Sequence, residues 1–286
     1  MGHVAALLPC GTRLHLQHGP IDLIIGAEGN RQAAFAAAEE RFAVVLDELV
    51  AELPLLRRPI STDAPRPRGR IAQRMDAATR PFAGTDWVTP MAAVAGSVAD
   101  TVLGAMTRAV ALDKAYVNNG GDIAIHLSEG QSFTMAMASH DGTDLGRIRI
   151  RHQDPVRGIA TSGRHGRSLS LGMADSVTAL AQTAAAADVA ATLIANAVDL
   201  PGHPGITRQP ATTCDPNSDL GDMQVVTACG PLSADDSIRA LQAGRARAQT
   251  YTKRGLCFGA ALFLQGHSEA THAAPFSLVQ RTPEYA

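Results

Sequence analysis

The chain has 286 residues, of which 45% are apolar and 18% charged, so it can bury a substantial hydrophobic core. This composition excludes a disordered, acidic-tail or collagen-like protein. The 25 basic and 27 acidic side chains give a formal net charge of −2, so no global field attracts a phosphate backbone. Nucleic acid is therefore not expected as a partner.

The signals for secretion and membrane insertion are weak. Four cysteines lie far apart without a C-x-x-C pair, unlike the dense disulfide framework of a small secreted domain. The first apolar run lacks the preceding basic residues of a signal peptide. The longest apolar stretch, 184–200, carries Asp188, Asn196 and Asp199, which a membrane span would avoid. The sequence thus predicts a cytoplasmic, reduced, soluble protein with no membrane partner.

The first third of the chain predicts a hairpin, a long helix and a loop. Strands are expected over 12–17 and 21–27, joined by a short Gly-Pro turn. Asn30 can cap a helix whose apolar residues recur at steps of three and four until Pro54. Residues 57–90 hold five prolines and seven arginines, which predicts a long loop. Its arginines could clamp a phosphorylated or polycarboxylate ligand, although such a run is also typical of a solvated surface.

The rest of the chain mixes strands and helices. An Ala/Gly-rich helix is expected over 91–109, packed closely either within the monomer or at a subunit contact of a homo-oligomer. The later elements expected are strands over 114–118, 122–127, 132–138, 147–151, 158–162 and 176–182, a helix over 184–198, a loop over 201–222, a strand over 224–229, a helix capped by Ser233 and ended by Gly255, and a strand over 256–264. This order predicts a single α+β domain over 1–286, with mixed, largely antiparallel sheets packed with helices.

The sharpest local motif is Asn118-Asn119-Gly120-Gly121-Asp122, between two predicted strands. Glycines allow positive φ and let a ligand approach the backbone, while the Asn and Asp side chains could bind an amide or a ring edge. The same residues are equally typical of a simple hairpin turn. The motif therefore predicts either a ligand contact or a turn.

A second motif covers residues 160–168 and is rich in hydroxyls, glycines and basic side chains. This composition fits an anion-binding loop, but also a solvated turn. It is not a Walker loop, because no Gly-Lys-Ser/Thr ends it. The residues predicted here to contact a ligand are Thr161, Ser162, Gly163, Arg164, His165 and Arg167.

A third motif is the pair Asp188 and Thr192, which lie four residues apart and so on one face of a predicted helix. A carboxylate and a hydroxyl can share Mg²⁺, which keeps most of its waters or phosphate oxygens as other ligands. The alternative is that Asp188 simply interacts favourably with the positive end of the helix dipole.

Taken in order, these motifs resemble the ApbE-like superfamily of flavin transferases. The resemblance covers about residues 88–200, and it is carried by Asn119–Ile123, Ala160–Gly163, Ser176–Thr178 and Ala187–Thr192. It is closest to a short, poorly characterised branch related to FAD:protein FMN transferases, on the stretches 89–100 and 168–176.

The resemblance implies an ApbE-like fold with a ligand cleft between its layers. It also implies that Gly120, Gly121 and Asp122 contact the ligand and that Asp188 with Thr192 holds Mg²⁺ at a pyrophosphate. The flavin transferases carry a His-Ile-x-Asp-Pro element after the Thr-Ser-Gly loop, where this chain has residues 167–175 instead. The branch is associated with tetrahydromethanopterin-dependent one-carbon metabolism, so the implied ligand is a flavin or a pterin.

Three functions follow as alternatives. The first is an enzyme of cofactor metabolism that takes a small-molecule cofactor or its precursor, a flat heteroaromatic ligand with anionic groups. The second is a non-catalytic flavin- or pterin-binding or carrier protein that keeps the fold without the chemistry. The third is a Mg²⁺-dependent transferase that moves FMN from FAD to a protein. The sequence identifies no catalytic residue for any of them.

Overall fold

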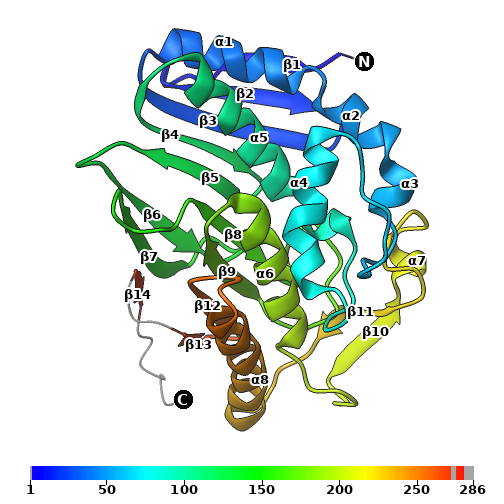
Figure 1. The fold of residues 1–286 in the computed structure, drawn as a ribbon. Helices are drawn as coiled ribbons and strands as arrows, with labels where there is room; N and C mark the ends of the chain where they lie inside the picture. The colour runs from blue at the N-terminus through cyan, green and yellow to red at the C-terminus, as the bar shows by residue number, and fades with distance from the viewer. Residues whose placement is uncertain (1, 272–274, 280–286) are drawn as a thin grey trace. The chain divides into compact units, whose positions relative to one another are not determined.

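The computed structural model describes residues 2–271 and 275–279 (Figure 1). These residues form two compact units, each built from separate stretches of sequence. Unit 1 combines the chain up to Ser132 with Arg151–Ala160 and Leu180–Val189. Unit 2 combines Phe133–Ile150 and Thr161–Ala179 with the chain from Ala190 onward. That the whole chain acts as a single domain stays a prediction.

Unit 1 contains an antiparallel sheet with the strand order β1-β2-β3-β4-β5-β8. Its strands are β1 (Val4–Leu7), β2 (Arg13–His18), β3 (Ile21–Gly29), β4 (Leu112–Asn119), β5 (Asp122–Leu127) and the first part of β8 (Gly158–Ser162). The predicted hairpin forms, with Leu16 opposite Leu23. Alternate residues of β3 from Ile21 to Ala27 are buried, so one face of the sheet packs in the core. The sequence analysis does not predict β1, whose residues are all exposed.

The expected long helix after Asn30 is interrupted. Asn30 caps α1 (Arg31–Phe42) as predicted, because its side-chain oxygen accepts a hydrogen bond from the Ala33 amide at 3.2 Å. The chain then continues as two shorter helices, α2 (Val45–Ala51) and α3 (Leu53–Leu56). Pro54 was expected to end a helix but lies in the first turn of α3, where its missing N–H costs no helical hydrogen bond.

The expectation of a loop throughout 57–90 is wrong. This segment contains α4 (Arg70–Thr79), followed by the 3₁₀ turn η1 (Arg80–Phe82). Prolines lie before and after α4, where they bound the helix, and none lies inside it. The apolar face of α4, with Ile71, Ala72 and Met75, is fully buried.

One of the seven arginines in this segment has a structural role. The Arg80 guanidinium binds the Asp76 carboxylate at 2.6 Å, and both side chains are largely buried. It also donates hydrogen bonds to the carbonyls of Ser61, Thr62 and Ala64. Arg80 therefore orders the preceding loop rather than meeting a ligand.

The Ala/Gly-rich helix forms as predicted, except that its first turn is the 3₁₀ helix η2 (Pro90–Ala93), which leads into α5 (Val94–Ala109). In unit 1, α5 lies on β4 and β5 and packs against α1 (Figure 1). Helix α4 also contacts α5. The first half of α6 (Ala184–Ala197) lies against the start of α5. Its backbone comes so close that a Cβ on Gly96 would lie 2.3 Å from the Ala184 carbonyl oxygen. Gly96 of α5 thus serves packing within the monomer.

Unit 2 contains three groups of strands. β14, β7 and β6 form one sheet, and β10 and β11 form a ribbon. The first part of β9 lies beside β12, which pairs with β13, and α8 packs against β12 and β13. The bounds are β6 (Ser132–Ala138), β7 (Asp144–Arg151), β9 (Ser176–Ala181), β10 (Ile206–Pro210), α7 (Ala211–Cys214), β11 (Gln224–Cys229), α8 (Ala234–Lys253), β12 (Gly259–Leu264), β13 (His267–Ala270) and β14 (Phe276–Leu278). The end signals of α8 are confirmed: Ser233 accepts from the Asp236 amide at 3.1 Å, and Gly255 has φ 72°.

The expected loop over 201–222 is wrong in part, because it contains β10 and α7. β10 pairs with β11 in register from Ile206–Cys229 to Pro210–Gln224, so Pro210 sits at the end of the ribbon. None of the helices in the described part of the chain has the length and apolar character needed to cross a membrane.

Candidate functional site

The Asn-Asn-Gly-Gly-Asp motif forms the tight turn between β4 and β5. Asn119 and Asp122 face each other across the hairpin, and the two residues between them, Gly120 and Gly121, have φ of 66° and 111°. Positive φ at both central positions is the geometry that favours glycine in a two-residue hairpin. The Asn118 side-chain oxygen closes the turn by accepting from the Gly121 amide at 2.8 Å. The turn interpretation is therefore confirmed, while a ligand contact here stays a prediction.

The same turn is fastened to the start of α5. Asn119 is buried, and its side-chain amide donates to the Ala95 carbonyl at 3.1 Å. The neighbouring amide of Gly96 donates to the Asp188 carboxylate at 2.9 Å. The hairpin tip, the first turn of α5 and the first half of α6 thus meet at one place in unit 1.

Helices α5 and α6 cap each other through two carboxylates. Asp188 of α6 accepts from the N-terminal amides of α5, at Gly96 and Ala95. In return, Asp100 of α5 accepts from the N-terminal amides of α6, at Ala184 (3.1 Å) and Ala185 (3.0 Å). Each carboxylate therefore satisfies the unpaired N–H groups of the other helix and interacts with the positive end of its dipole.

Both carboxyl groups are held in a poorly solvated place. Burial raises the pKa of Asp188 well above its ordinary value, and the negative charges of Asp122 and Asp100 add to this. Burial also raises the pKa of Asp100, although the amides of α6 and the Arg74 guanidinium at 3.7 Å counteract it. In the absence of a bound cation, the charged form of Asp188 is thus destabilised by burial and by the nearby carboxyl group of Asp122.

The predicted site residues fall in both units. Residues 118–122 and Asp188 belong to unit 1, whereas residues 161–167 and Thr192 belong to unit 2. Thr192 is half-buried, one helical turn after Asp188 on α6. In the part of the chain that the structure describes, no group of three or more His, Cys, Asp and Glu side chains could hold a metal ion.

The loop that follows β8 is held by an internal ion pair. The Arg164 guanidinium binds the Asp175 carboxylate through two N–H groups, at 2.6 and 3.0 Å, and both side chains are largely buried. His165 lies 3.4 Å from the same carboxylate oxygen. Arg164 is therefore engaged by an internal acid eleven residues later, and its predicted contact with an anionic ligand stays a prediction.

The other residues of this loop support its shape or lie at the surface. Thr161 shares a hydrogen bond with Thr178 at 3.0 Å. A Cβ on Gly163 would lie 2.6 Å from the Asp175 carbonyl oxygen, so this position needs glycine. Ser162 is half-buried and Arg167 is exposed. These observations neither exclude nor test a ligand contact at Thr161, Ser162, Gly163 or Arg167.

His165 also stacks on His140, with ring centroids 3.7 Å apart and planes inclined by 12°. Burial lowers the pKa of His165, and the charges of Arg164 and His140 lower it further. A lowered pKa keeps the ring neutral at physiological pH, which suits face-to-face stacking on a second imidazole.

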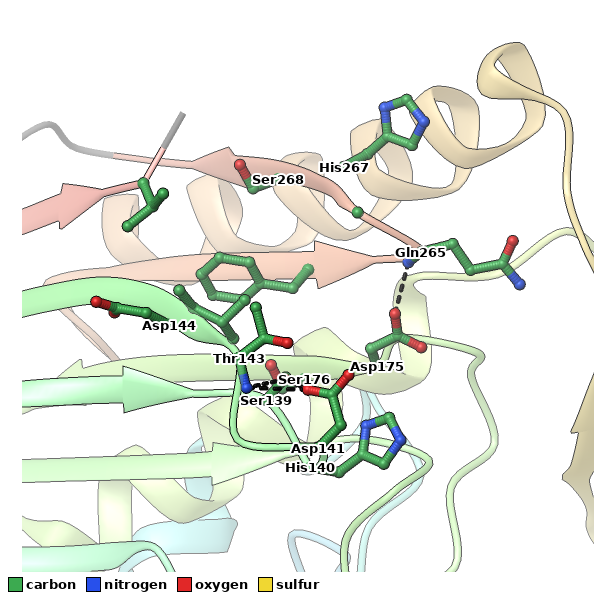
Figure 2. Close-up of a pocket in the computed structure, with 14 residues that line it drawn as sticks. Ser139, His140, Asp141, Thr143, Asp144, Asp175, Ser176, Gln265, His267 and Ser268 are labelled. Atoms are coloured by element: carbon green, nitrogen blue, oxygen red, sulfur yellow. Dashed lines mark hydrogen bonds between the residues drawn. The ribbon is translucent and has the colours of Figure 1, made fainter. Parts of the chain in front are cut away.

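Two residues that contact this loop, His140 and Asp175, also line a cavity of ≈210 Å³ in unit 2 (Figure 2). The β6–β7 turn, the segment before β9 and the β12–β13 turn form its walls. The lining residues are Ser139, His140, Asp141, Thr143, Asp144, Leu145, Asp175, Ser176, Phe263, Gln265, Gly266, His267, Ser268 and Val279.

Sequence reasoning missed three residues that organise these places: Asp100, Asp175 and His140. The first two lie in the stretches 89–100 and 168–176, which carry the family resemblance, and this is the one signal that could have found them. Their partners are fixed by tertiary structure, because Asp100 binds Ala184 and Ala185 more than eighty residues away.

Cys10 should be the most reactive of the four thiols. It is exposed, and hydrogen bonds from Arg13 and Thr12 lower its pKa to about 6. The thiolate, and not the thiol, is the nucleophile. Burial raises the pKa of Cys229 and Cys257, so a smaller fraction of these two thiols is ionised at neutral pH.

Iodoacetamide at neutral pH should therefore modify Cys10 before Cys229 and Cys257, as followed by peptide mass spectrometry. Its rate should rise through a midpoint near pH 6. Arg13→Gln should move the midpoint upward, because the largest stabilising hydrogen bond to the thiolate is lost. An unchanged midpoint would show that Arg13 does not tune this thiol.

Comparison with known proteins identifies the family. The family model described as "AbpE bacteria" matches residues 5–270. The chain belongs to the AbpE bacteria family. A UPF0280 protein of Methanosphaerula palustris is 34% identical over 203 residues, which span 68% of this chain and 79% of that protein. The UPF0280 protein MK0206 of Methanopyrus kandleri is 33% identical over 180 residues, 61% of this chain and 69% of the relative.

A solved structure shares the fold of this AbpE bacteria chain. The ApbE protein of Thermotoga maritima superposes with a TM-score of 0.50 at 10% sequence identity, covering 94% of this chain and 96% of that one. The predicted α+β class, with largely antiparallel sheets packed with helices in an ApbE-like fold, is thereby confirmed.

Proposed function

We propose that this chain binds a flat heteroaromatic cofactor with anionic groups, a flavin in the first place, together with Mg²⁺ at Asp188. Membership of the AbpE bacteria family and the ApbE-like fold support a role in handling a small-molecule cofactor. The observation that carries the proposal is the position of Asp188. This carboxyl, with its strongly raised pKa, lies at the start of α5 beside Asp122 and the Gly-Gly turn.

The residues present fit a hard cation. A carboxyl group whose pKa is raised by burial and by a neighbouring carboxylate, as at Asp188, is stabilised when a divalent ion replaces the proton. Carboxylate oxygens are ligands that Mg²⁺ prefers, and it would keep waters or phosphate oxygens as its other ligands. Asp188 would hold the ion, and the contribution of Thr192 stays a prediction. When bound, Mg²⁺ would neutralise phosphate oxygens of the cofactor.

The chain's own residues would bind and orient the ring. Gly120 and Gly121 present backbone without Cβ atoms, so a flat ligand can approach the turn closely. Asp122 can accept a hydrogen bond from a ring N–H. Because Arg164 is engaged by Asp175, the anionic groups of the ligand would be met mainly by the metal ion.

Transfer of FMN to a protein is the less supported function. Residues 167–175 stand where the flavin transferases carry their His-Ile-x-Asp-Pro element, and the segment ends in the Asp175 cluster. Binding without transfer, or different chemistry on a flavin or pterin, fits this replacement better. A pterin of the tetrahydromethanopterin type remains the alternative ligand that the test must separate.

Thermal unfolding with candidate cofactors tests the proposal. FAD, FMN and a reduced pterin are each added with and without Mg²⁺. A ligand that binds only the folded state raises the free energy of unfolding by about 2.7 kcal/mol at a hundredfold excess over its Kd. We expect such a shift with FAD, and we expect it to depend on Mg²⁺.

Asp188→Asn should abolish the Mg²⁺ dependence. Asp100→Asn is the matched control, because it removes the other capping carboxylate of the same helix pair and should keep the Mg²⁺ dependence. An unchanged response in Asp188→Asn would refute the metal assignment. A shift with the pterin alone would refute the flavin, and no shift with any cofactor would refute the function.

A further inference from the structure

The cavity of unit 2 has a strong bias in its charged groups (Figure 2). Three aspartates line it, at positions 141, 144 and 175, together with His140 and His267, and no lysine or arginine is among the described lining residues. A cavity with this lining repels a phosphate or carboxylate and attracts a cation or a donor of hydrogen bonds. It therefore differs from a site for the anionic groups of the proposed cofactor.

Two of the three carboxylates are already neutralised. Asp175 is bound by Arg164, and Asp144 is bound by Arg147 at 2.6 Å. Asp141 instead accepts hydrogen bonds from the Ser139 hydroxyl and from the Thr143 amide at 3.0 Å. These neutral donors lower the pKa of Asp141 far below its ordinary value, so it remains a carboxylate throughout the physiological range. Among the described lining residues, Asp141 is thus the aspartate that no Lys or Arg binds, although the neighbouring His140 also favours its charged form.

The rest of the lining suits an organic ligand better than a bare metal ion. Ser176 and Ser268 add hydroxyls, whereas Phe263, Leu145 and Val279 add apolar surface for a carbon skeleton.

The β12–β13 turn at the rim of the cavity is a tight two-residue hairpin. Gln265 has φ 45°, a value seen at no other non-glycine residue in the described chain. Its amide donates to the Asp175 carboxylate at 2.5 Å, and its side chain donates to the Gly230 carbonyl at 2.8 Å. Positive φ at both central residues, Gln265 and Gly266, is the ordinary geometry of a two-residue hairpin, and these hydrogen bonds fix the position of the turn. The rim is therefore preorganised.

We propose that this cavity is a second ligand site, which binds a small protonated primary amine with its ammonium group at Asp141 and its carbon skeleton against Phe263, Leu145 and Val279. The site is separate in its chemistry from the proposed cofactor site. Its test can therefore succeed or fail independently of the flavin.

Isothermal titration calorimetry at low ionic strength tests the proposal with three probes of one skeleton. The probes are putrescine, the diol of the same chain length, and succinate. Charge-assisted hydrogen bonds are about twice as strong as neutral ones, so putrescine should bind about tenfold more tightly than the diol. Succinate should not bind, and salt should weaken the binding of putrescine.

Two variants locate the ammonium. Asp141→Asn should weaken putrescine about fivefold, the effect typical of one exposed charge pair. Asp113→Asn removes the same charge from an exposed residue outside the cavity and should change nothing. Because Asp141 also braces its own turn, Ser268→Lys gives a second test, since an added ammonium at this exposed rim position should abolish binding.

Four results would overturn the proposal: no binding of putrescine, equal binding of putrescine and the diol, binding of succinate as tight as that of putrescine, or equal losses in Asp141→Asn and Asp113→Asn. Equal binding of the diol would identify a polyol site instead.

Discussion

Replacing Gly96 with alanine should destabilise the protein by about 3 kcal/mol, the upper part of the range for forcing an extra carbon into a packed core. The added Cβ would lie 2.3 Å from the Ala184 carbonyl oxygen and 2.6 Å from the Ala185 amide nitrogen. Both are backbone atoms of α6, so no side chain can rotate away. Helix α5 must move, and the hydrogen bond from Gly96 to Asp188 is then lost.

Helix propensity predicts the opposite sign, which makes this test discriminating. Alanine in a helix interior is ordinarily more stable than glycine by about 1 kcal/mol. Gly104→Ala on the same helix is the matched control, because its Cβ would meet only the end of the flexible Arg108 side chain, at 3.1 Å. Urea denaturation should show a gain for Gly104→Ala and a loss for Gly96→Ala. A gain in both would show that the helices are not in close contact at Gly96.

The close contact at Gly96 matters for the site because it fixes where Asp188 lies. Gly96 is both the residue that α6 touches and a donor to the Asp188 carboxylate. Asp100 fastens the same crossing from the other side. A cofactor that binds at Asp188 therefore meets a carboxylate whose position is set by two helices, which favours a preorganised site.

Local signals in the sequence predict the elements that depend on neighbouring residues. The His18-Gly19-Pro20 turn, the Asn30 cap and the Ser233 cap each rest on contacts within a few residues, and all form as predicted. The prediction of a loop throughout 57–90 is wrong because the number of prolines does not exclude a helix; only a proline inside the helix would. Pro67 and Pro81 flank a helix with a buried apolar face, and prolines outside a helix do not break it.

The candidate site depends on contacts that no local pattern contains. The basic loop predicts that Arg164 meets an anion, but nothing local predicts that the fold also brings Asp175 to its guanidinium. The Asn-Gly-Gly segment is informative about the turn, since positive φ is a local requirement. That Asp188 lies at the start of α5 could not be predicted, because its partner Gly96 is 92 residues earlier. Spacing along a helix identifies a face, whereas tertiary structure decides what that face meets.

The second large effect concerns pH. The pKa of Asp188 is raised well above its ordinary value in the folded protein, so the folded state holds a proton at pH values where the unfolded chain has released it. The stability from this proton is fully present below the ordinary aspartate pKa. It is lost as pH rises through the raised pKa of the folded state. In the absence of metal, the wild-type protein should thus become less stable relative to Asp188→Asn as pH rises.

Asp188→Asn resembles the protonated acid, keeps an oxygen that can accept from Gly96, and carries no charge beside Asp122. At alkaline pH we expect it to be more stable than the wild type by about 1 kcal/mol, as is typical when a functional charge is removed from a constrained site. The difference should vanish toward pH 4. Paired urea titrations across this range measure it, and comparing the two proteins cancels the opposite acid-side effect of Asp141, Asp144 and Asp236, whose pKa values are lowered.

With Mg²⁺ present, the wild type should become more stable than Asp188→Asn. The ion stabilises the Asp188 carboxylate of the wild type, whereas the Asn variant offers it no charged ligand at this position. A wild type that stays more stable than Asp188→Asn at every pH without metal would show that the α5 amides alone compensate the charge. Asp188 would then act as a helix cap, and no cation would be needed to explain its position.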